Sequence, residues 1–203
     1  MIIGILHEGE SDFATLEVLS RNILENRLGV TIKNLSFASL CANGPTPPKL
    51  SAAAIRFFET PLKKDSKVDF MIFHSDVDGD STKRTSAITL RDQYQRDKPP
   101  VQIALALPEP HMEEWFFAEV DALCAYFEIS VEELDRIPGK TPKDKMKSLI
   151  NAYSEVTLSS NEIYAAISER IDIDKLFNRD QNFQYFTNDL LSTYNAWSQG
   201  VGR

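Results

Sequence analysis

The sequence of 203 residues contains little cysteine and no long apolar run. Its two cysteines, Cys41 and Cys124, have no second cysteine or histidine nearby at ligand spacing. This argues against a disulfide framework or a zinc site and favours reduced thiols. No segment approaches the ~20 apolar residues of a membrane span, and the first residues, MIIGILHEG, lack the basic segment of a signal peptide. We therefore expect a soluble cytoplasmic protein with no membrane partner.

Positive charge is also scarce. The chain has 22 basic and 30 acidic residues and a formal net charge of −8, which argues against a protein that coats nucleic acid by bulk electrostatic attraction. A local basic face stays open, because the stretch PGKTPKDKMKS contains Lys140, Lys143, Lys145 and Lys147. Such a run is either solvated surface or a phosphate-binding face.

The first half of the chain alternates between strand and helix patterns. The predicted order is strand 1–8, helix 11–29, strand 30–40, helix 49–62, strand 67–75, helix 81–97 and strand 101–108. Ser11 or Asp12 can cap the first helix, and Gly29 can end it. The continuous apolar run at 67–75 is typical of a strand buried on both faces. This order predicts an α/β fold with a parallel four-stranded sheet flanked by helices.

After Pro108 the pattern becomes entirely helical. The segments with helical spacing are 111–127, 130–137, 142–154, 161–171 and 182–197. Ser130 and Glu133 form a capping-box pattern at the start of the second segment. No flexible linker separates the two halves, so we expect an α/β core over 1–108 with a C-terminal helical appendage, 109–203, packed on it.

Acidic side chains follow three of the predicted strands. They are Glu8 and Glu10, then Asp76, Asp78 and Asp80, and finally Glu109, Glu113 and Glu114. Ligands collect at the carboxyl ends of the strands in an open α/β sheet, so we expect these groups to face one site. Residues i and i+2 of an extended segment point to the same side, so Asp76 and Asp78 can direct two carboxylates at one point while Gly79 turns the chain.

The stretch DVDGD, residues 76–80, has two other interpretations. It can be a simple polar turn, since aspartates often cap backbone N–H groups. It also resembles the start of an EF-hand calcium loop, but Ala87 or Thr89 stands where the bidentate glutamate of that loop belongs. Acids at three strand ends favour a divalent-cation site, because like charges repel each other unless a cation neutralises them.

These motifs carry a resemblance to a known family. Glu8-Gly9 after the first strand and the pair Asp76 and Asp78 after the third resemble the TOPRIM domain of topoisomerases, bacterial-type primases and nucleases of the overcoming-lysogenization-defect group. Nearly the whole chain is similar to a family of small TOPRIM-like bacterial proteins, some linked to anti-phage defence. The segments that carry this similarity are EGESDFATLEVL, HSDVDGD, LPEPHMEEWFFAE, PKDKMKSLI and ISERIDIDKLFNRDQNFQYFTNDL. His7 and Glu114 depart from that pattern without removing a proposed ligand.

The resemblance implies a TOPRIM-like (Rossmann-like) core and a centre that holds Mg²⁺ or Mn²⁺. It makes Glu8 the general acid/base or a metal ligand, and Asp76 and Asp78 the metal ligands. Asp80 and Glu113 are assigned to the same metal site. His74 and His111 flank this site in sequence; each can be structural, and His111 could orient a phosphate. Trp115 is expected in the core between the two halves.

A metal-dependent nuclease is the first functional hypothesis, because such a centre supports attack on a phosphodiester. The residues expected to contact the phosphates of nucleic acid are Lys83, Arg84, Lys140, Lys143 and Lys147. A silent TOPRIM-like module that binds a partner protein or nucleic acid, and a phosphatase or phosphotransferase for small nucleotides, are the alternatives. The chain has no G-x-x-x-x-G-K-[ST] motif. In a defence system it would therefore be a subunit whose ATPase partner is a separate protein.

Overall fold

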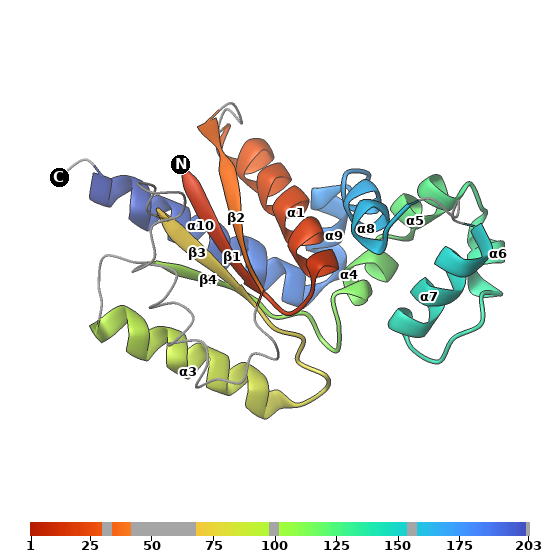
Figure 1. Ribbon diagram of the computed structural model, residues 1–203, viewed down its shortest axis with the longest axis horizontal. Helices are drawn as coiled ribbons and strands as arrows, with labels where there is room; N and C mark the ends of the chain where they lie inside the picture. The colour runs from red at the N-terminus through yellow and green to blue at the C-terminus, as the bar shows by residue number, and fades with distance from the viewer. Residues whose placement is uncertain (30–33, 42–67, 98–101, 154–157, 202–203) are drawn as a thin grey trace.

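The computed structural model describes residues 1–29, 34–41, 68–97, 102–153 and 158–201. In chain order its elements are β1 (Ile2–His7), α1 (Glu10–Leu28), β2 (Ser36–Cys41), β3 (Phe70–His74), α3 (Ser81–Asp97), β4 (Ile103–Ala106), α4 (Glu113–Ala118), α5 (Val120–Phe127), α6 (Val131–Asp135), α7 (Pro142–Tyr153), α8 (Ser160–Ser168), α9 (Ile173–Arg179) and α10 (Gln181–Val201). Figure 1 shows their arrangement. The helix predicted over 49–62 lies outside the described residues.

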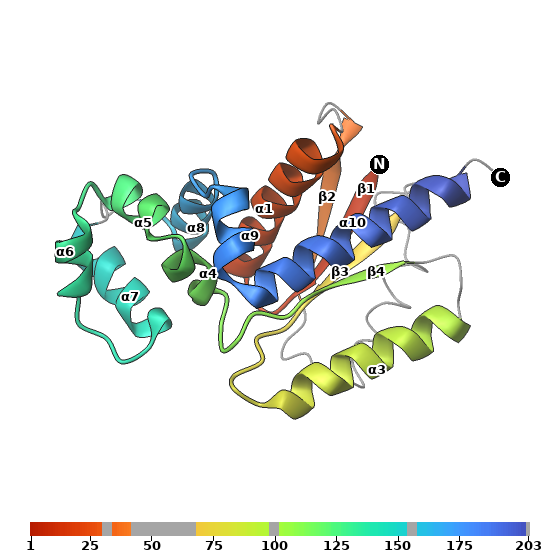
Figure 2. The ribbon, with the colours of Figure 1, turned by 180° about the vertical axis from the view of Figure 1, so that it is seen from behind.

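The four strands form one parallel sheet in the order β2-β1-β3-β4. All residues of β3 and β4 are buried, as the apolar run at 67–75 predicted for its strand. Helices cover both faces of the sheet (Figures 1 and 2). The α/β fold with a parallel sheet flanked by helices is therefore confirmed, and it is compatible with a Rossmann-like architecture.

Alternation along the strands divides the core between the two faces. Ile3, Ile5 and Ile72 point to the face that α1 and α10 cover. Met71 and Phe73, from the intervening positions of β3, belong to a second apolar cluster on the face of α3. The carboxyl ends of the strands point toward α4 and α7 (Figure 1).

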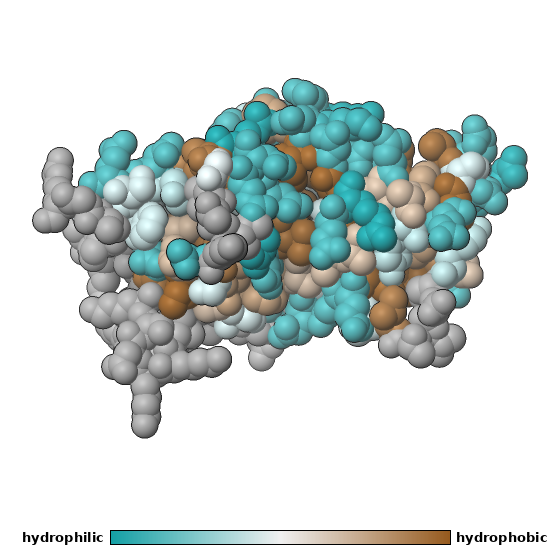
Figure 3. All heavy atoms as spheres, turned by 90° about the horizontal axis from the view of Figure 1, so that it is seen from above, coloured by the Kyte–Doolittle hydropathy of each residue, from teal (hydrophilic) through white to brown (hydrophobic). Residues whose placement is uncertain are grey.

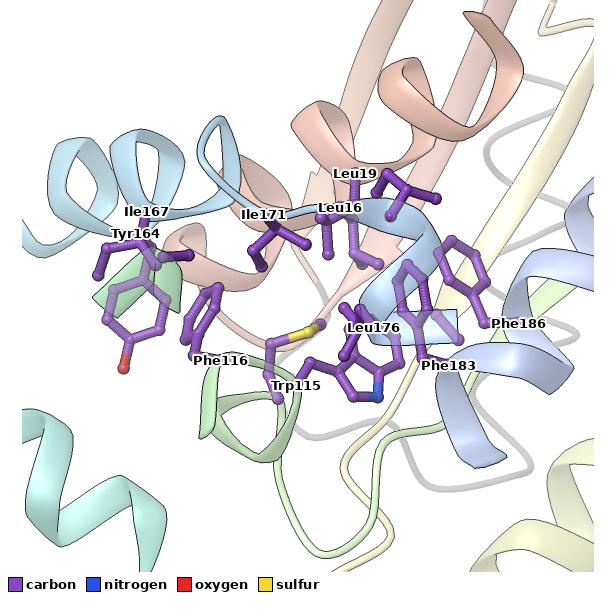
Figure 4. Close-up of a cluster of buried hydrophobic side chains, with 14 of the residues drawn as sticks. Leu16, Leu19, Trp115, Phe116, Tyr164, Ile167, Ile171, Leu176, Phe183 and Phe186 are labelled. Atoms are coloured by element: carbon purple, nitrogen blue, oxygen red, sulfur yellow. The ribbon is translucent and has the colours of Figure 1, made fainter. Parts of the chain in front are cut away.

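Trp115 joins the sheet layers to the C-terminal helices. Its side chain is fully buried, and its ring centroid lies 5.1 Å from that of Phe183 and 5.6 Å from that of Phe186. Figure 4 shows this cluster, whose labelled residues are Leu16, Leu19, Trp115, Phe116, Tyr164, Ile167, Ile171, Leu176, Phe183 and Phe186. Both aromatic partners of Trp115 come from α10, which packs on β3 and β4. The last helix of the predicted appendage is thus also a layer of the α/β sandwich.

Three local predictions differ from the structure. The segment 111–127 forms two helices, because Glu119 leaves the helical conformation (φ −122°, ψ 70°) and its carboxylate accepts from Ala122 N–H to cap α5. Helix α9 was not predicted. Gly9, not Ser11 or Asp12, is the N-cap of α1, and Asp12 accepts a hydrogen bond from Gly9 N–H (2.8 Å). The predicted ending of α1 at Gly29 is confirmed.

On the face seen in Figure 3, hydrophobic side chains are scattered among hydrophilic ones. No helix in the described part of the chain is long and apolar enough to span a bilayer.

Side chains of α3 and α10 meet across the outer edge of β4. Asp189 accepts a hydrogen bond from Leu105 N–H (2.7 Å), a backbone donor of this edge strand. The same carboxylate accepts two hydrogen bonds from the Arg91 guanidinium, at 3.0 and 2.9 Å. An unpaired strand edge can recruit other strands, so this contact both joins the two helices and protects the edge.

Replacing Asp189 with Ala should therefore lower the free energy of unfolding by about 1–3 kcal/mol, since a backbone donor and Arg91 lose their acceptor. Asp189→Asn should cost less, because its amide oxygen can still accept from Leu105 N–H. Asp92→Ala, which removes an exposed partner of Arg91, should change it by less than about 0.5 kcal/mol. Urea denaturation measures all three. Equal, small effects would contradict a role of Asp189 at the edge.

Candidate metal centre

The loops after β3 and β4 stay paired beyond the ends of the strands. Val77 N–H donates to the Pro108 carbonyl (3.1 Å). One residue later, Asp78 N–H donates to the Pro110 carbonyl (2.9 Å). This pairing places His111, which is distant in sequence, beside the acids that follow β3.

Asp76, Asp78 and His111 form the candidate metal centre. Each offers one ligand atom, and these atoms lie within 4.8 Å of one another. The His111 Nδ1 atom is 3.3 Å from Asp76 Oδ2 and 3.1 Å from Asp78 Oδ1. Adjacent ligands of an octahedral ion at ~2.1 Å are about 3.0 Å apart. His111 Nδ1 is thus spaced from each carboxylate as a neighbouring ligand of one ion would be, and the group could hold such an ion.

The chain turns sharply at the second acid. Asp78 has a left-handed backbone (φ 54°), and Gly79 follows with φ 71°. Asp tolerates this conformation better than most residues, and Gly adopts it freely. The two carboxylates therefore meet at His111 through a turn rather than through the extended spacing that the sequence suggested. The other carboxylate oxygen of Asp78 pairs with the Lys83 ammonium, and this contact raises the pKa of Lys83.

His74 lies behind the first acid and is fully buried. Its Nε2 is 3.5 Å from Asp76 Oδ1, and its Nδ1 is 3.7 Å from Asp12 Oδ2, yet neither nitrogen makes a hydrogen bond within the described part of the chain. Burial lowers the pKa of His74, but the two carboxylates outweigh burial and raise it above the ordinary value. Met112 N–H donates to Asp76 Oδ1 (3.1 Å). These contacts fix the Asp76 carboxylate from behind.

The acids of this centre are neutralised by the chain's own cations. Burial raises the pKa of Asp76, but His74, His111 and Lys143 lower it by more, so it ends below the usual range. Lys83 balances Asp78. The sequence predicted acids that repel each other until a cation binds. In the structure, Lys83 and Lys143 already supply positive charge beside these acids, so an added ion has to compete with Lys83 for Asp78.

Glu8 lies beside this group without being part of it. Its Oε1 atom accepts a hydrogen bond from Ser75 Oγ (2.9 Å), so the end of β1 is tied to the end of β3. Just before it, His7 contacts the Gly9 carbonyl through Nδ1 (2.7 Å) and Ser39 Oγ through Nε2 (2.7 Å). Both contacts hold the turn that presents the Glu8 carboxylate. Burial lowers the pKa of His7, which favours a neutral ring.

A cavity of about 360 Å³ opens next to these acids. Its lining residues are Glu8, Gly9, Ser11, Asp12, Asp76, Glu113, Lys143, Lys147, Ile150, Ser160 and Tyr164. Lys143 and Lys147 stand one helical turn apart on α7 and line the cavity together with Glu8 and Asp76 of the strand ends, whereas Asp78 and His111 are not among its lining residues. The cavity therefore combines carboxylates that can hold a cation with ammonium groups that can bind an anion.

Glu113 lines the same cavity, but its contacts differ from those of the metal group. It is buried, and its Oε1 atom accepts a hydrogen bond from the Tyr164 hydroxyl (2.8 Å). Burial and the Glu113 charge raise the pKa of Tyr164, so the hydroxyl keeps its proton. Among the described residues, the group within 4.8 Å does not include Glu113.

Three other predicted site residues either contact residues outside the metal group or do not line the cavity. Asp80 is exposed and accepts hydrogen bonds from Thr82 N–H (2.9 Å) and Thr82 Oγ1 (2.6 Å) at the start of α3. The Arg84 guanidinium donates to the Leu107 carbonyl, to Glu109 and to Asn182. Lys140 is exposed and does not line the cavity. The structure thus brings Lys143 and Lys147 to the acids, and not Arg84 or Lys140.

Sequence reasoning missed three residues that shape this site. Ser75 lies next to Asp76 in sequence, and a hydroxyl between two candidate site residues was a usable signal. Asp12 was considered only as a helix cap. Tyr164 lies 51 residues from its partner Glu113, and nothing in its local sequence marks it.

Metal binding should stabilise the parent protein and not an Asp78→Asn variant. At a concentration ~100 times Kd, bound Mn²⁺ should raise Tm by about 5–10 °C. Asp78→Asn keeps a residue that tolerates the left-handed backbone but removes a charged ligand, so most of this rise should disappear. Thermal denaturation with MnCl₂ and with EDTA measures the effect.

Asp80→Asn is the matched control for that variant. Asn is an equally good helix N-cap, so Asp80→Asn should keep the whole Mn²⁺-dependent rise. Loss of the rise in Asp80→Asn, or an undiminished rise in Asp78→Asn, would contradict this choice of ligands.

Comparison with protein-family models, with curated proteins and with solved structures finds no match to this chain.

Proposed function

We propose that the chain is a divalent-metal-dependent phosphodiester hydrolase that acts on nucleic acid. One observation carries this proposal: a single cavity is lined by Glu8 and Asp76 from the strand ends together with Lys143 and Lys147 from α7. A structural acidic turn has no need of ammonium groups that share a cavity with it. A phosphodiester bound to a cation needs both.

The two lysines are available to an anion. No hydrogen bond or ion pair of either lysine with another described residue is found, and the positive charge of Lys143 lowers the pKa of Asp76 across the cavity. Lys143 and Lys147 can therefore hold a phosphate group against the metal centre. Because the net charge of the chain is −8, this confined basic surface would supply the attraction that the rest of the protein lacks.

Glu8 is placed to accept a proton. It lines the cavity beside Asp76, and the Ser75 hydroxyl fixes one of its oxygens. The carboxylate is therefore held where it can take a proton from a water molecule or pass one to a leaving group. A divalent ion, when bound, would polarise a phosphoryl oxygen and stabilise charge on the leaving oxygen. Asp76, Asp78 and His111 would hold that ion, and Lys83 would neutralise the remaining charge of Asp78.

A small nucleotide is a second candidate substrate. The cavity volume of about 360 Å³ lies at the lower end of the range for small-molecule sites. The same residues could then serve as a phosphatase or phosphotransferase centre. A role in anti-phage defence and a separate ATPase partner remain proposals that rest on the resemblance alone.

Purified protein should cleave nucleic acid in Mg²⁺ or Mn²⁺ and not in EDTA. The substrates to compare are plasmid, single-stranded DNA, RNA and mononucleotides. Glu8→Gln should reduce the cleavage rate by about 10²-fold or more, as expected for loss of a proton acceptor, and should keep most of the metal-dependent rise in Tm. An inactive parent on every substrate and in both metals would favour the silent, partner-binding module.

Charge reversal of the α7 lysines should weaken binding without unfolding the protein. The double variant Lys143→Glu/Lys147→Glu should bind nucleic acid more weakly. The plot of log K against log [salt] should also become less steep, by about 0.7–0.9 for each phosphate that the variant no longer neutralises. Lys140→Glu is the matched control, because it makes the same change of charge at a position outside the cavity. The single variant Lys143→Glu should weaken nucleic-acid binding more than Lys140→Glu does. Equal decreases in affinity for these two variants would show that the lysines act only through the overall charge of the protein and not through the cavity.

A further inference from the structure

We propose that His111 is a direct ligand and that its nitrogen makes the centre prefer a first-row transition ion such as Mn²⁺ to Mg²⁺. The inference rests on the metal centre of the proposed function but not on hydrolysis. The inference can therefore be correct even if the protein does not cleave nucleic acid.

The position of one atom motivates the proposal. His111 Nδ1 is buried and makes no hydrogen bond to a described residue, although it lies 3.3 Å from Asp76 Oδ2 and 3.1 Å from Asp78 Oδ1. A buried polar atom without a partner is costly, so native structures seldom keep one without a reason. An ion that contacts all three atoms would satisfy this nitrogen and both oxygens together.

A simple ion pair explains the geometry less well. A protonated His111 would be expected to donate its N–H to one of the oxygens, and neither contact has hydrogen-bond geometry. Each acid also has another basic side chain beside it, since His74 lies next to Asp76 and Lys83 pairs with Asp78. The Nε2 atom of His111 is not buried in this way, so when an ion takes the lone pair of Nδ1 the proton on Nε2 can be donated to water.

The chemistry of the donor set then indicates the ion. Mg²⁺ favours hard oxygen ligands and is reluctant to lose water, whereas imidazole is a common ligand of first-row transition metals. Mn²⁺ accepts carboxylates readily and binds nitrogen better than Mg²⁺ does. A site of two carboxylates and one imidazole should thus discriminate between the two ions, and an all-oxygen site should do so much less.

His111→Asn is the decisive substitution, because the Asn amide oxygen can occupy nearly the place of Nδ1. It exchanges a nitrogen donor for an oxygen donor and keeps the number of ligands. Isothermal titration of the metal-free full chain with MnCl₂ and MgCl₂ should show tighter Mn²⁺ binding, by about tenfold or more. In His111→Asn this ratio should fall to about threefold or less, mainly through weaker Mn²⁺ binding.

Pulsed electron paramagnetic resonance of the Mn²⁺ complex tests the parent protein directly, and His111→Asn serves as its comparison. The electron spin echo of the parent should be modulated by a directly bound ¹⁴N nucleus, and the modulation should be absent in His111→Asn. No ¹⁴N coupling in the parent, an unchanged coupling in the variant, or equal affinity of the parent for the two ions would each overturn the proposal. Failure to cleave nucleic acid would overturn the proposed function and leave this inference standing.

Discussion

The backbone pairing between the loops after β3 and β4 is the constraint on which the candidate site depends. Parallel strands end at the same edge of a sheet, but their loops normally separate there. Here Asp78 N–H still donates to the Pro110 carbonyl beyond the strand ends, so the two loops stay side by side. The acids that follow β3 and the imidazole that follows β4 are therefore held together by main-chain hydrogen bonds, and their side-chain rotamers need only small adjustments to share a ligand.

Local charge balance is the second feature of the site, and the net charge of the chain conceals it. The acids at the strand ends face His74, Lys83 and Lys143, which together supply the positive charge that an ion would otherwise supply. This balance offsets part of the mutual repulsion of the carboxylates. It also means that a cation displaces or shares existing partners, so metal affinity and phosphate affinity are expected to be coupled through the same lysines.

Much of this arrangement could be read from the sequence, and the remainder depends on contacts that no local pattern records. Apolar runs and acids at strand ends predicted the sheet and the neighbourhood of Glu8 and Asp76. The position of His111 depends on how two loops pair in register, and the engagement of Arg84 depends on where α10 returns to the sheet. Glu119 interrupts a segment whose helical spacing is continuous, because a buried capping contact outweighs helix propensity there.

The central claim is that one ion binds between the loops that follow β3 and β4. The most direct test is an anomalous difference map from a crystal grown with Mn²⁺, recorded on the long-wavelength side and on the short-wavelength side of the manganese absorption edge. One strong edge-dependent peak is expected in contact with Asp76, Asp78 and His111. A peak held by Glu8 and Glu113 without Asp78, or no peak at the strand ends at saturating Mn²⁺, would contradict it.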